Sequence, residues 1–133
     1  PPDAAPRRVL YLIWRDPWMT VARDTYISRS LAAVGWHTVP EVRGGDGLHQ
    51  PGHARYPAFD WSADWLAGVD TVLLSSEPYR FGTPHADEVR GLLARRSLHP
   101  VVRCIPGEWA SWYGVRAVDG LRQLAALARE TSV

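Results

Sequence analysis

The stretch VLLSSEPYRFG, residues 72–82, decides the fold because it joins an apolar run to a polar and aromatic turn. Its first three residues are typical of a strand that is buried on both faces of a parallel sheet. Two serines, a glutamate and a proline then end the run. A buried strand that stops in this way predicts either a simple turn or one wall of a binding site.

Apolar runs and helical spacing alternate along the rest of the chain. Besides 69–76, the runs predict strands at 7–14, 37–40 and 99–106. Helices are predicted at 20–36, 60–68, 83–96 and 118–130.

Individual residues set the expected ends of these helices. Gly35 is expected at the C-terminus of the first helix. Asp60 or Ser62 is expected to cap the second, and Thr83 to cap the third with Pro84 in its first turn. A long loop rich in glycine, histidine and proline, 41–57, follows the second strand.

Strands that alternate with helices predict an α/β fold. We expect a three-layer αβα sandwich, Rossmann-like, with a mostly parallel sheet of about four strands. Residues 1–6 are expected to be a linker, and residues 7–133 a single lobe. The chain begins PPDAAPRR without an initiator methionine, so it is expected to be a piece of a larger protein.

Composition narrows the function classes. The 133 residues carry a net charge of +1, and all 15 basic residues are arginine, so charge suggests neither nucleic acid nor a membrane surface as a partner. The single cysteine excludes an internal disulfide framework and a multi-cysteine metal site. No stretch resembles a membrane span or a signal peptide.

Aromatic and acidic residues gather where the predicted strands end. The carboxyl ends of parallel strands meet at one edge of a sheet, where ligands commonly bind. Seven tryptophans in the chain include several at these exits, and aromatic rings often line ligand surfaces as well as cores. Four arginines near the exits are candidate partners for acidic groups of a ligand: Arg15, Arg55, Arg80 and Arg116.

Catalytic and metal-binding patterns are weaker. Ser75 or Ser76 with His85 could form part of a triad, but no nucleophile-elbow glycine pattern surrounds either serine. Cys104 and His99 lie on or beside one strand and make a poor nucleophile pair. The loop pair His49 and His53 has no third ligand in clear spacing.

Four stretches in their order along the chain resemble a known family. They are RVLYLIWRDPWMTVARDTYISRSLAAVGW, RYP, VDTVLLSSEPYRF and GEWASWYGVR. This pattern resembles the C-terminal lobe of class III, helical-backbone substrate-binding proteins of ABC importers, the TroA and vitamin B12-binding-like group. That family implies two α/β lobes joined by a long helix, with the ligand held in the cleft between them.

The resemblance implies a ligand, partners and a location. The cargo would be a metal chelate, namely a corrinoid, a haem or a ferric siderophore, with no covalently bound cofactor and no metal site of the protein's own. The partners would be the N-terminal lobe of the same protein and an ABC permease, outside the cytoplasm. The implied ligand-binding residues are Trp14, Trp18, Tyr56, Glu77, Tyr79, Phe81, Glu108, Trp109 and Trp112.

One position departs from the family pattern. A surface glutamate usually follows the Tyr-Pro loop and pairs with arginines of the permease, and Ser62 falls near its place here. Docking to a permease would then use Asp60 or Asp64.

Two other hypotheses about the function remain open. One is a small α/β enzyme that uses Glu77 or Glu108 as a general base. The other is a stand-alone interaction module whose tryptophan-rich edge is a protein interface. An isolated lobe could also dimerise through an exposed apolar half-cleft.

Overall fold

The structure is a computed structural model, and it describes residues 7–42 and 56–106. Four parallel strands form one sheet in the order β2-β1-β3-β4. The strands are β1 (Arg7–Leu12), β2 (Trp36–Thr38), β3 (Thr71–Ser75) and β4 (Val101–Ile105). The predicted α/β class, the parallel sheet and its four strands are therefore confirmed.

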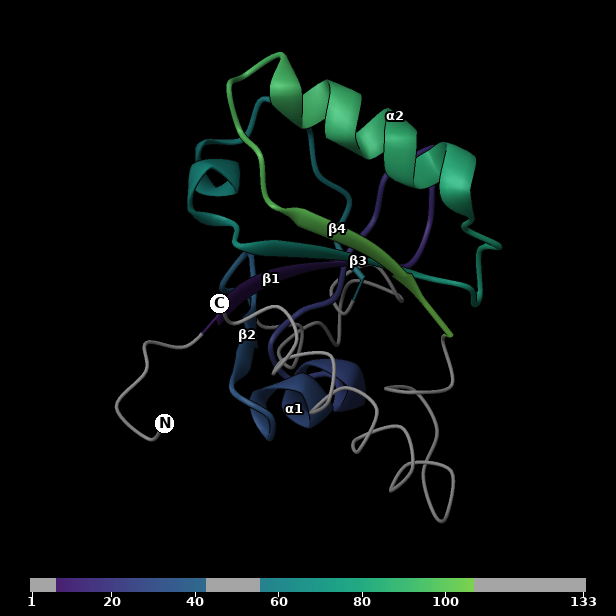
Figure 1. The fold of residues 1–133 in the computed structure, drawn as a ribbon. Coiled ribbons are helices and arrows are strands. Elements are labelled where there is room, and N and C mark those ends of the chain that lie inside the picture. Colours follow the sequence, from purple (N-terminus) through teal and green to yellow (C-terminus); the bar gives the residue numbers. More distant parts are fainter. Residues whose placement is uncertain (1–6, 43–55, 107–133) are drawn as a thin grey trace.

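Two α-helices cover opposite faces of this sheet (Figure 1). They are α1 (Tyr26–Ala32) and α2 (Thr83–Ala94), and a short 3-10 helix, η2 (Asp64–Gly68), precedes β3. The closing helix predicted at 118–130 lies outside the described residues, as do the segment 1–6 and most of the long loop.

The sheet separates two hydrophobic cores. On the α1 side, Val9, Tyr11 and Leu73 pack with Leu31 of the helix. On the α2 side, alternate residues of the same strands, Leu10, Leu12, Val72 and Leu74, pack with Val89 and Leu93 of the helix. Every residue of β3 is buried, which is the pattern that a central strand with both faces covered requires.

The first helix is shorter than predicted. It begins only after Thr25, whose hydroxyl accepts a hydrogen bond from the Ser28 amide at 3.1 Å. Val21 is fully buried in the loop before the cap, so apolar spacing that suggested a helix belongs instead to an irregular segment packed on the core. Gly35 lies beyond the helix end with φ 85°, the left-handed conformation expected of it.

The other helix starts also differ from prediction. Residues 60–63 are not helical, and Ala63 precedes η2 without a side-chain cap. Asp60 instead accepts a hydrogen bond from the Ser62 amide at 2.8 Å within a turn. Gly82 is the N-cap of α2, so Thr83 is the first helical residue rather than the cap.

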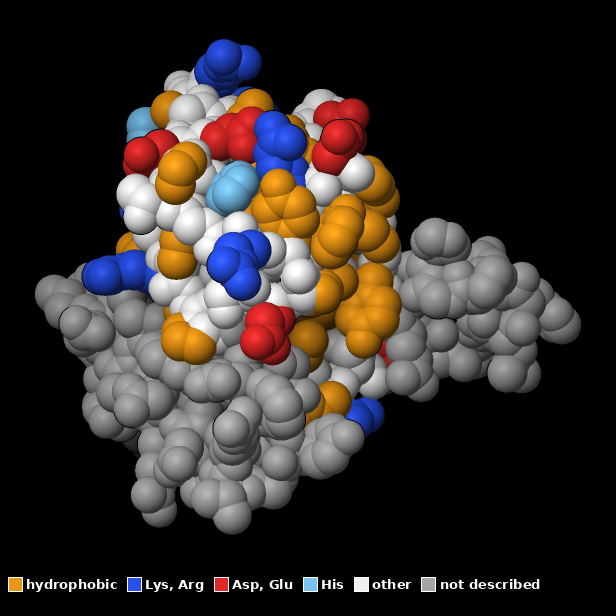
Figure 2. Space-filling view, turned by 90° about the vertical axis from the view of Figure 1, so that its right-hand side faces the viewer, with side chains coloured by type: hydrophobic (Ala, Val, Ile, Leu, Met, Phe, Trp, Pro, Cys, Tyr) orange, Lys and Arg blue, Asp and Glu red, His pale blue; other side chains and the backbone are white. Residues whose placement is uncertain are grey.

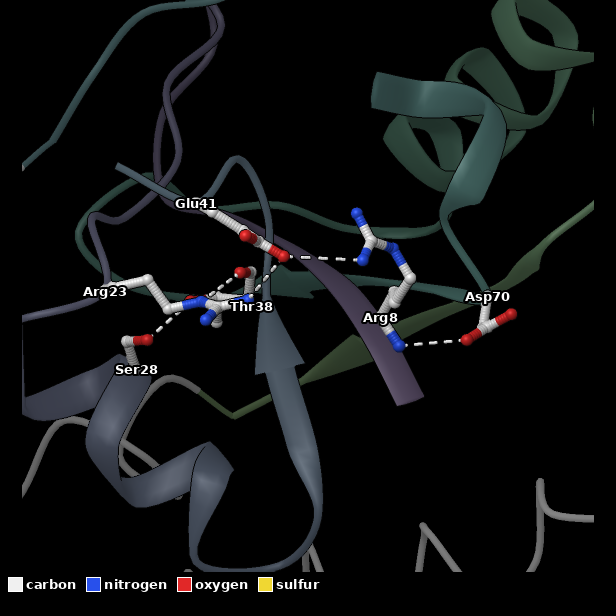
Figure 3. Close-up of polar contacts among 6 residues, drawn as sticks. All are labelled: Arg8, Arg23, Ser28, Thr38, Glu41 and Asp70. Atoms are coloured by element: carbon white, nitrogen blue, oxygen red, sulfur yellow. Dashed lines mark hydrogen bonds and ion pairs between the residues drawn. The ribbon is translucent and has the colours of Figure 1, made fainter. Parts of the chain in front are cut away.

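Charged residues flank the sheet around β1 and the end of β2 (Figure 3). The Arg8 amide donates to Asp70 at 2.9 Å, which fixes the start of β1 beside the start of β3. Arg23 donates to the Thr38 carbonyl at 2.7 Å. Glu41 lies within 3.5 Å of Arg8 and 3.4 Å of Arg23. The contacts of Arg23 and Glu41 hold the end of the edge strand β2 beside β1.

Candidate functional site

The strand order creates a crevice between β1 and β3. The chain leaves β1 toward α1 and β2 on one side, and leaves β3 toward α2 on the other face of the sheet (Figure 1). Loops that diverge from adjacent parallel strands leave open space at their carboxyl ends, where ligands bind in α/β proteins.

A pocket of about 620 Å³ lies at this point. Its described lining comes from the exits of β1 and β3, from α1 and from the Tyr-Pro segment: Ile13, Trp14, Met19, Ile27, Tyr56, Glu77 and Pro78. Six of these seven side chains are apolar or aromatic, and one is a carboxylate. A pocket of this size and character suits a largely apolar small molecule with few polar contacts.

The loop after β1 is built as a tight turn that presents Trp14. The Ile13 amide donates to the Met19 carbonyl at 3.0 Å, and the Met19 amide donates back to Trp14 at 3.1 Å. Asp16 takes the left-handed conformation in this turn, with φ 69°. Trp14 is 39% exposed and lines the pocket, so part of its surface is open to a ligand.

The loop after β1 also holds the Tyr-Pro segment, residues 56–57, at the site through backbone contacts. Met19 pairs with Ala58 in an isolated antiparallel bridge, and the Thr20 amide donates to the Pro57 carbonyl at 3.0 Å. Tyr56, 36% exposed, is thereby placed on the pocket wall together with Trp14. Two segments about forty residues apart in sequence thus form one continuous wall.

The loop after β3 fixes Glu77 through Ser75. The Ser75 hydroxyl donates to the Glu77 carbonyl at 2.6 Å and accepts from the Glu77 amide at 3.2 Å. Below this turn lies Tyr11, and burial raises the pKa of its phenol to about 12, opposed in part by the nearby Ser75 hydroxyl and reinforced by the Glu77 charge. The backbone of Glu77 is held while its side chain stays exposed at the pocket.

A row of aromatic rings runs from the pocket toward the α2 side. Trp14 meets Tyr79 edge-on with centroids 5.2 Å apart, and Tyr79 lies 4.6 Å from Phe81. Phe81 stacks on Trp18 at 6.1 Å, and Trp18 meets Trp61 at 5.2 Å. Figure 2 looks from the side toward which β3 and β4 run in Figure 1, and shows a band of hydrophobic side chains across this face.

An ion pair fastens the loop after β1 to α2. Arg15 donates two hydrogen bonds to the Glu88 carboxylate, at 2.8 and 2.7 Å, and both side chains are 35% exposed. The hydrogen bonds from Arg15 lower the pKa of Glu88 and raise the pKa of Arg15 itself. The Arg15 guanidinium also lies 5.4 Å from the centre of the Trp18 ring. Its charge is therefore engaged within the protein, contrary to the expectation that it serves a ligand.

The predicted ligand-binding residues separate into three groups. Trp14, Tyr56 and Glu77 lie together on the pocket wall, and Tyr79 lies behind Trp14. Trp18 is half-buried, and Phe81 is only 5% exposed in the α2-side core, so the Phe81 ring has almost no surface to offer a ligand.

The remaining predicted residues are in other places. Asp60 and Asp64 are both exposed, and the Ser62 hydrogen bonds lower the pKa of Asp60. The others lie outside the described residues: Arg55, Glu108, Trp109, Trp112 and Arg116.

Sequence reasoning did not single out the aliphatic part of the lining. Ile13, Met19 and Ile27 also pack on the α1-side core, so their apolar character alone does not distinguish a pocket wall from core. Met19 is the only methionine in the chain, and its place one residue after Trp18 was the one available hint.

The structure does not pair Ser75 with His85, and the loop pair His49 and His53 lies outside the described residues. The Ser75 hydroxyl is fully buried and donates to the Glu77 carbonyl, whereas His85 accepts from the Gly82 amide at 3.0 Å. Burial raises the pKa of Cys104, which disfavours the nucleophilic thiolate. Across residues 7–42 and 56–106, no three acidic, histidine or cysteine side chains cluster as a metal site.

Comparison with known proteins gives one informative result. No family model matches the chain, and no curated protein matches it in sequence. Among solved structures, the chain is similar to the periplasmic vitamin B12-binding protein BtuF of Vibrio cholerae, with a TM-score of 0.64 at 14% sequence identity. The match covers 98% of this chain and 47% of that protein, so this chain spans about half the length of the protein it matches.

This likeness establishes the class of fold: a parallel α/β arrangement of the kind seen in that binding protein. In the described segments, no helix is both long and apolar enough to cross a bilayer.

Proposed function

We propose that the chain is a solute-binding lobe of an ABC importer receptor, and that its cargo is a metal chelate such as a corrinoid, a haem or a ferric siderophore. The observation that carries the proposal is the pocket at the β1–β3 crevice, which brings Trp14, Tyr56 and Glu77 together. The solved structure of similar fold is described as a vitamin B12-binding protein.

The geometry supports a large, flat and partly apolar ligand. Trp14 and Tyr56 are rigid rings with little side-chain entropy to lose, and both present more than a third of their surface. Trp14 is backed by Tyr79 and its loop is fixed to α2 through Arg15 and Glu88, so this face is organised before the ligand arrives.

In this proposal the pocket is one side of a cleft. The chain matches 47% of the length of the vitamin B12-binding protein. This share supports a role as one lobe that closes on another. We propose the C-terminal lobe, an extracytoplasmic location, and a permease as the transport partner. Asp60 and Asp64 are exposed and remain the proposed docking carboxylates. We propose no catalytic step.

Equilibrium binding to the full chain tests the proposal. Quenching of tryptophan fluorescence would be titrated with cyanocobalamin, haemin and ferrichrome. Tyr56→Leu and Trp14→Leu should each weaken the binding of whichever chelate is bound. Tyr26→Leu is the matched control, because Tyr26 is 37% exposed but does not line the pocket.

The outcomes separate clearly. Saturable binding that both pocket variants weaken, while the control does not, supports a chelate-binding lobe. If none of the three chelates binds, or if the control weakens binding as much as the pocket variants, the proposal is wrong.

A further inference from the structure

We propose that Glu77 selects cargo by the chemistry of its edge, favouring a macrocycle bordered by N–H donors such as primary amides over one bordered by carboxylates. This inference rests on the proposed function and adds a specificity-determining residue to it. It follows from the place of one carboxylate in an otherwise apolar and aromatic pocket wall.

The Glu77 side chain has no competing partner in the described structure. Four ion pairs occur within residues 7–42 and 56–106, and none involves Glu77. The arginine of the neighbouring loop, Arg15, gives two hydrogen bonds to Glu88 instead. The carboxylate oxygens of Glu77 are thus available to accept hydrogen bonds from a ligand.

The backbone beneath this carboxylate is fixed. Ser75 is fully buried at the end of β3 and makes hydrogen bonds to both the amide and the carbonyl of Glu77. The next residue, Pro78, has a constrained backbone and also lines the pocket. A fixed backbone limits the positions that the carboxylate can reach, which favours directional hydrogen bonds to a ligand.

The remaining wall makes the discrimination sharper. In this proposal Trp14 and Tyr56 cover the face of a flat ligand, and Glu77, the one carboxylate of the same described lining, meets its edge. An amide N–H donates to a carboxylate in a charge-assisted hydrogen bond. A carboxylate at the same place would meet a like charge in a partly desolvated site, which is the usual physical basis of rejection.

Matched ligand pairs test this directly. Dicyanocobinamide and dicyanocobyrinic acid share a corrin ring, a metal and axial cyanides, but the first has an amide edge and the second a carboxylate edge. Haemin and its dipropionamide form a second pair. Dissociation constants would be measured for the full chain, with the fold of each variant checked by circular dichroism.

We expect the amide member of a bound pair to bind at least about tenfold more tightly than its carboxylate partner. Glu77→Gln should bring this ratio close to one, and Glu77→Arg should reverse it. Asp87→Asn removes the same unit of charge from an exposed position on α2 and should leave the ratio unchanged. Higher salt should reduce the preference.

Failure of the inference differs from failure of the proposed function. Equal binding within a pair, or a ratio that Glu77→Gln does not alter, overturns the role of Glu77 while chelate binding stands. If no member of either pair binds, the proposed macrocycle cargo is wrong and the inference falls with it.

Discussion

Replacing Tyr11 with phenylalanine should remove a buried phenol that titrates at a higher pH than tyrosine usually does. Tyr11 is fully buried in β1, and burial raises its pKa to about 12. The unfolded chain would give up this proton at about pH 10. Because the folded pKa is the higher one, the contribution of Tyr11 to stability is complete below pH 10 and declines as the pH rises toward 12.

The size of the effect follows from the two pKa values. A difference of about two units makes the wild-type protein lose roughly 2 kcal/mol of unfolding free energy between pH 10 and 12 through this group. Tyr11→Phe lacks that loss. At pH 7 the substitution should cost nothing and could add up to about 1 kcal/mol, because the hydroxyl is buried without a hydrogen-bond partner among the described residues.

The Tyr11 hydroxyl lies near Ser75 but has no hydrogen-bond partner among the described residues. The Ser75 hydroxyl is close enough to lower the phenol's pKa somewhat, but its own proton is donated to the Glu77 carbonyl at 2.6 Å. Ser75 therefore does not stabilise Tyr11 with a full hydrogen bond of its own.

Two assays check the prediction. Tyrosinate absorbance should show a late step in the folded wild-type protein that Tyr11→Phe removes and Tyr26→Phe, at an exposed site, leaves in place. Urea unfolding at pH 7 and at pH 11 should give a smaller alkaline loss for Tyr11→Phe. A late step that survives Tyr11→Phe, or a loss of more than about 1 kcal/mol at pH 7, would refute the reasoning.

Four further substitutions test the structure that surrounds the site. Glu88→Gln should lower the melting temperature at low salt and neutral pH, because it removes the ion pair with Arg15. Since that pair lowers the pKa of Glu88, the difference from wild type should shrink as pH falls through the folded pKa, and also at high salt; a difference that is constant in both would contradict this. Leu73→Ala in the central strand should cost about 2–5 kcal/mol in urea unfolding, and a cost below about 1 kcal/mol would mean that this strand is not packed on both faces. Gly35→Ala should destabilise the protein by about 1–2 kcal/mol because φ is 85°, whereas Gly91→Ala in the middle of α2 should stabilise it by about 0.5–1 kcal/mol, and equal signs would contradict the assigned backbone.

The sequence predicted the sheet well because burial leaves a direct mark on strands. The run at residues 72–74 is apolar at every position, as a strand covered on both faces requires, and three other apolar runs gave the remaining strands. The convergence of strand exits followed from parallel topology alone, and it correctly brought Trp14 and Glu77 to one place.

The limits of prediction lie in the loops and caps. Tyr79 and Phe81 are two residues apart in a non-periodic turn, so nothing in the pattern tells that one meets Trp14 near the pocket while the other enters the core. The partner of Arg15 is on α2, more than seventy residues away, and no local pattern encodes that pairing. Val21 is buried without being helical, since packing of a loop leaves the same apolar signal as a helix face.

The division of the interior into two cores gives this protein built-in optical reporters. Trp36 is buried on the α1 side of the sheet, whereas Trp61 and Trp65 pack on the α2 side. Single-tryptophan variants that retain one or the other would follow the loosening of each layer separately. Their unfolding curves would coincide if the sheet transmits stability between the layers, and would separate if either helix can detach while the strands remain paired.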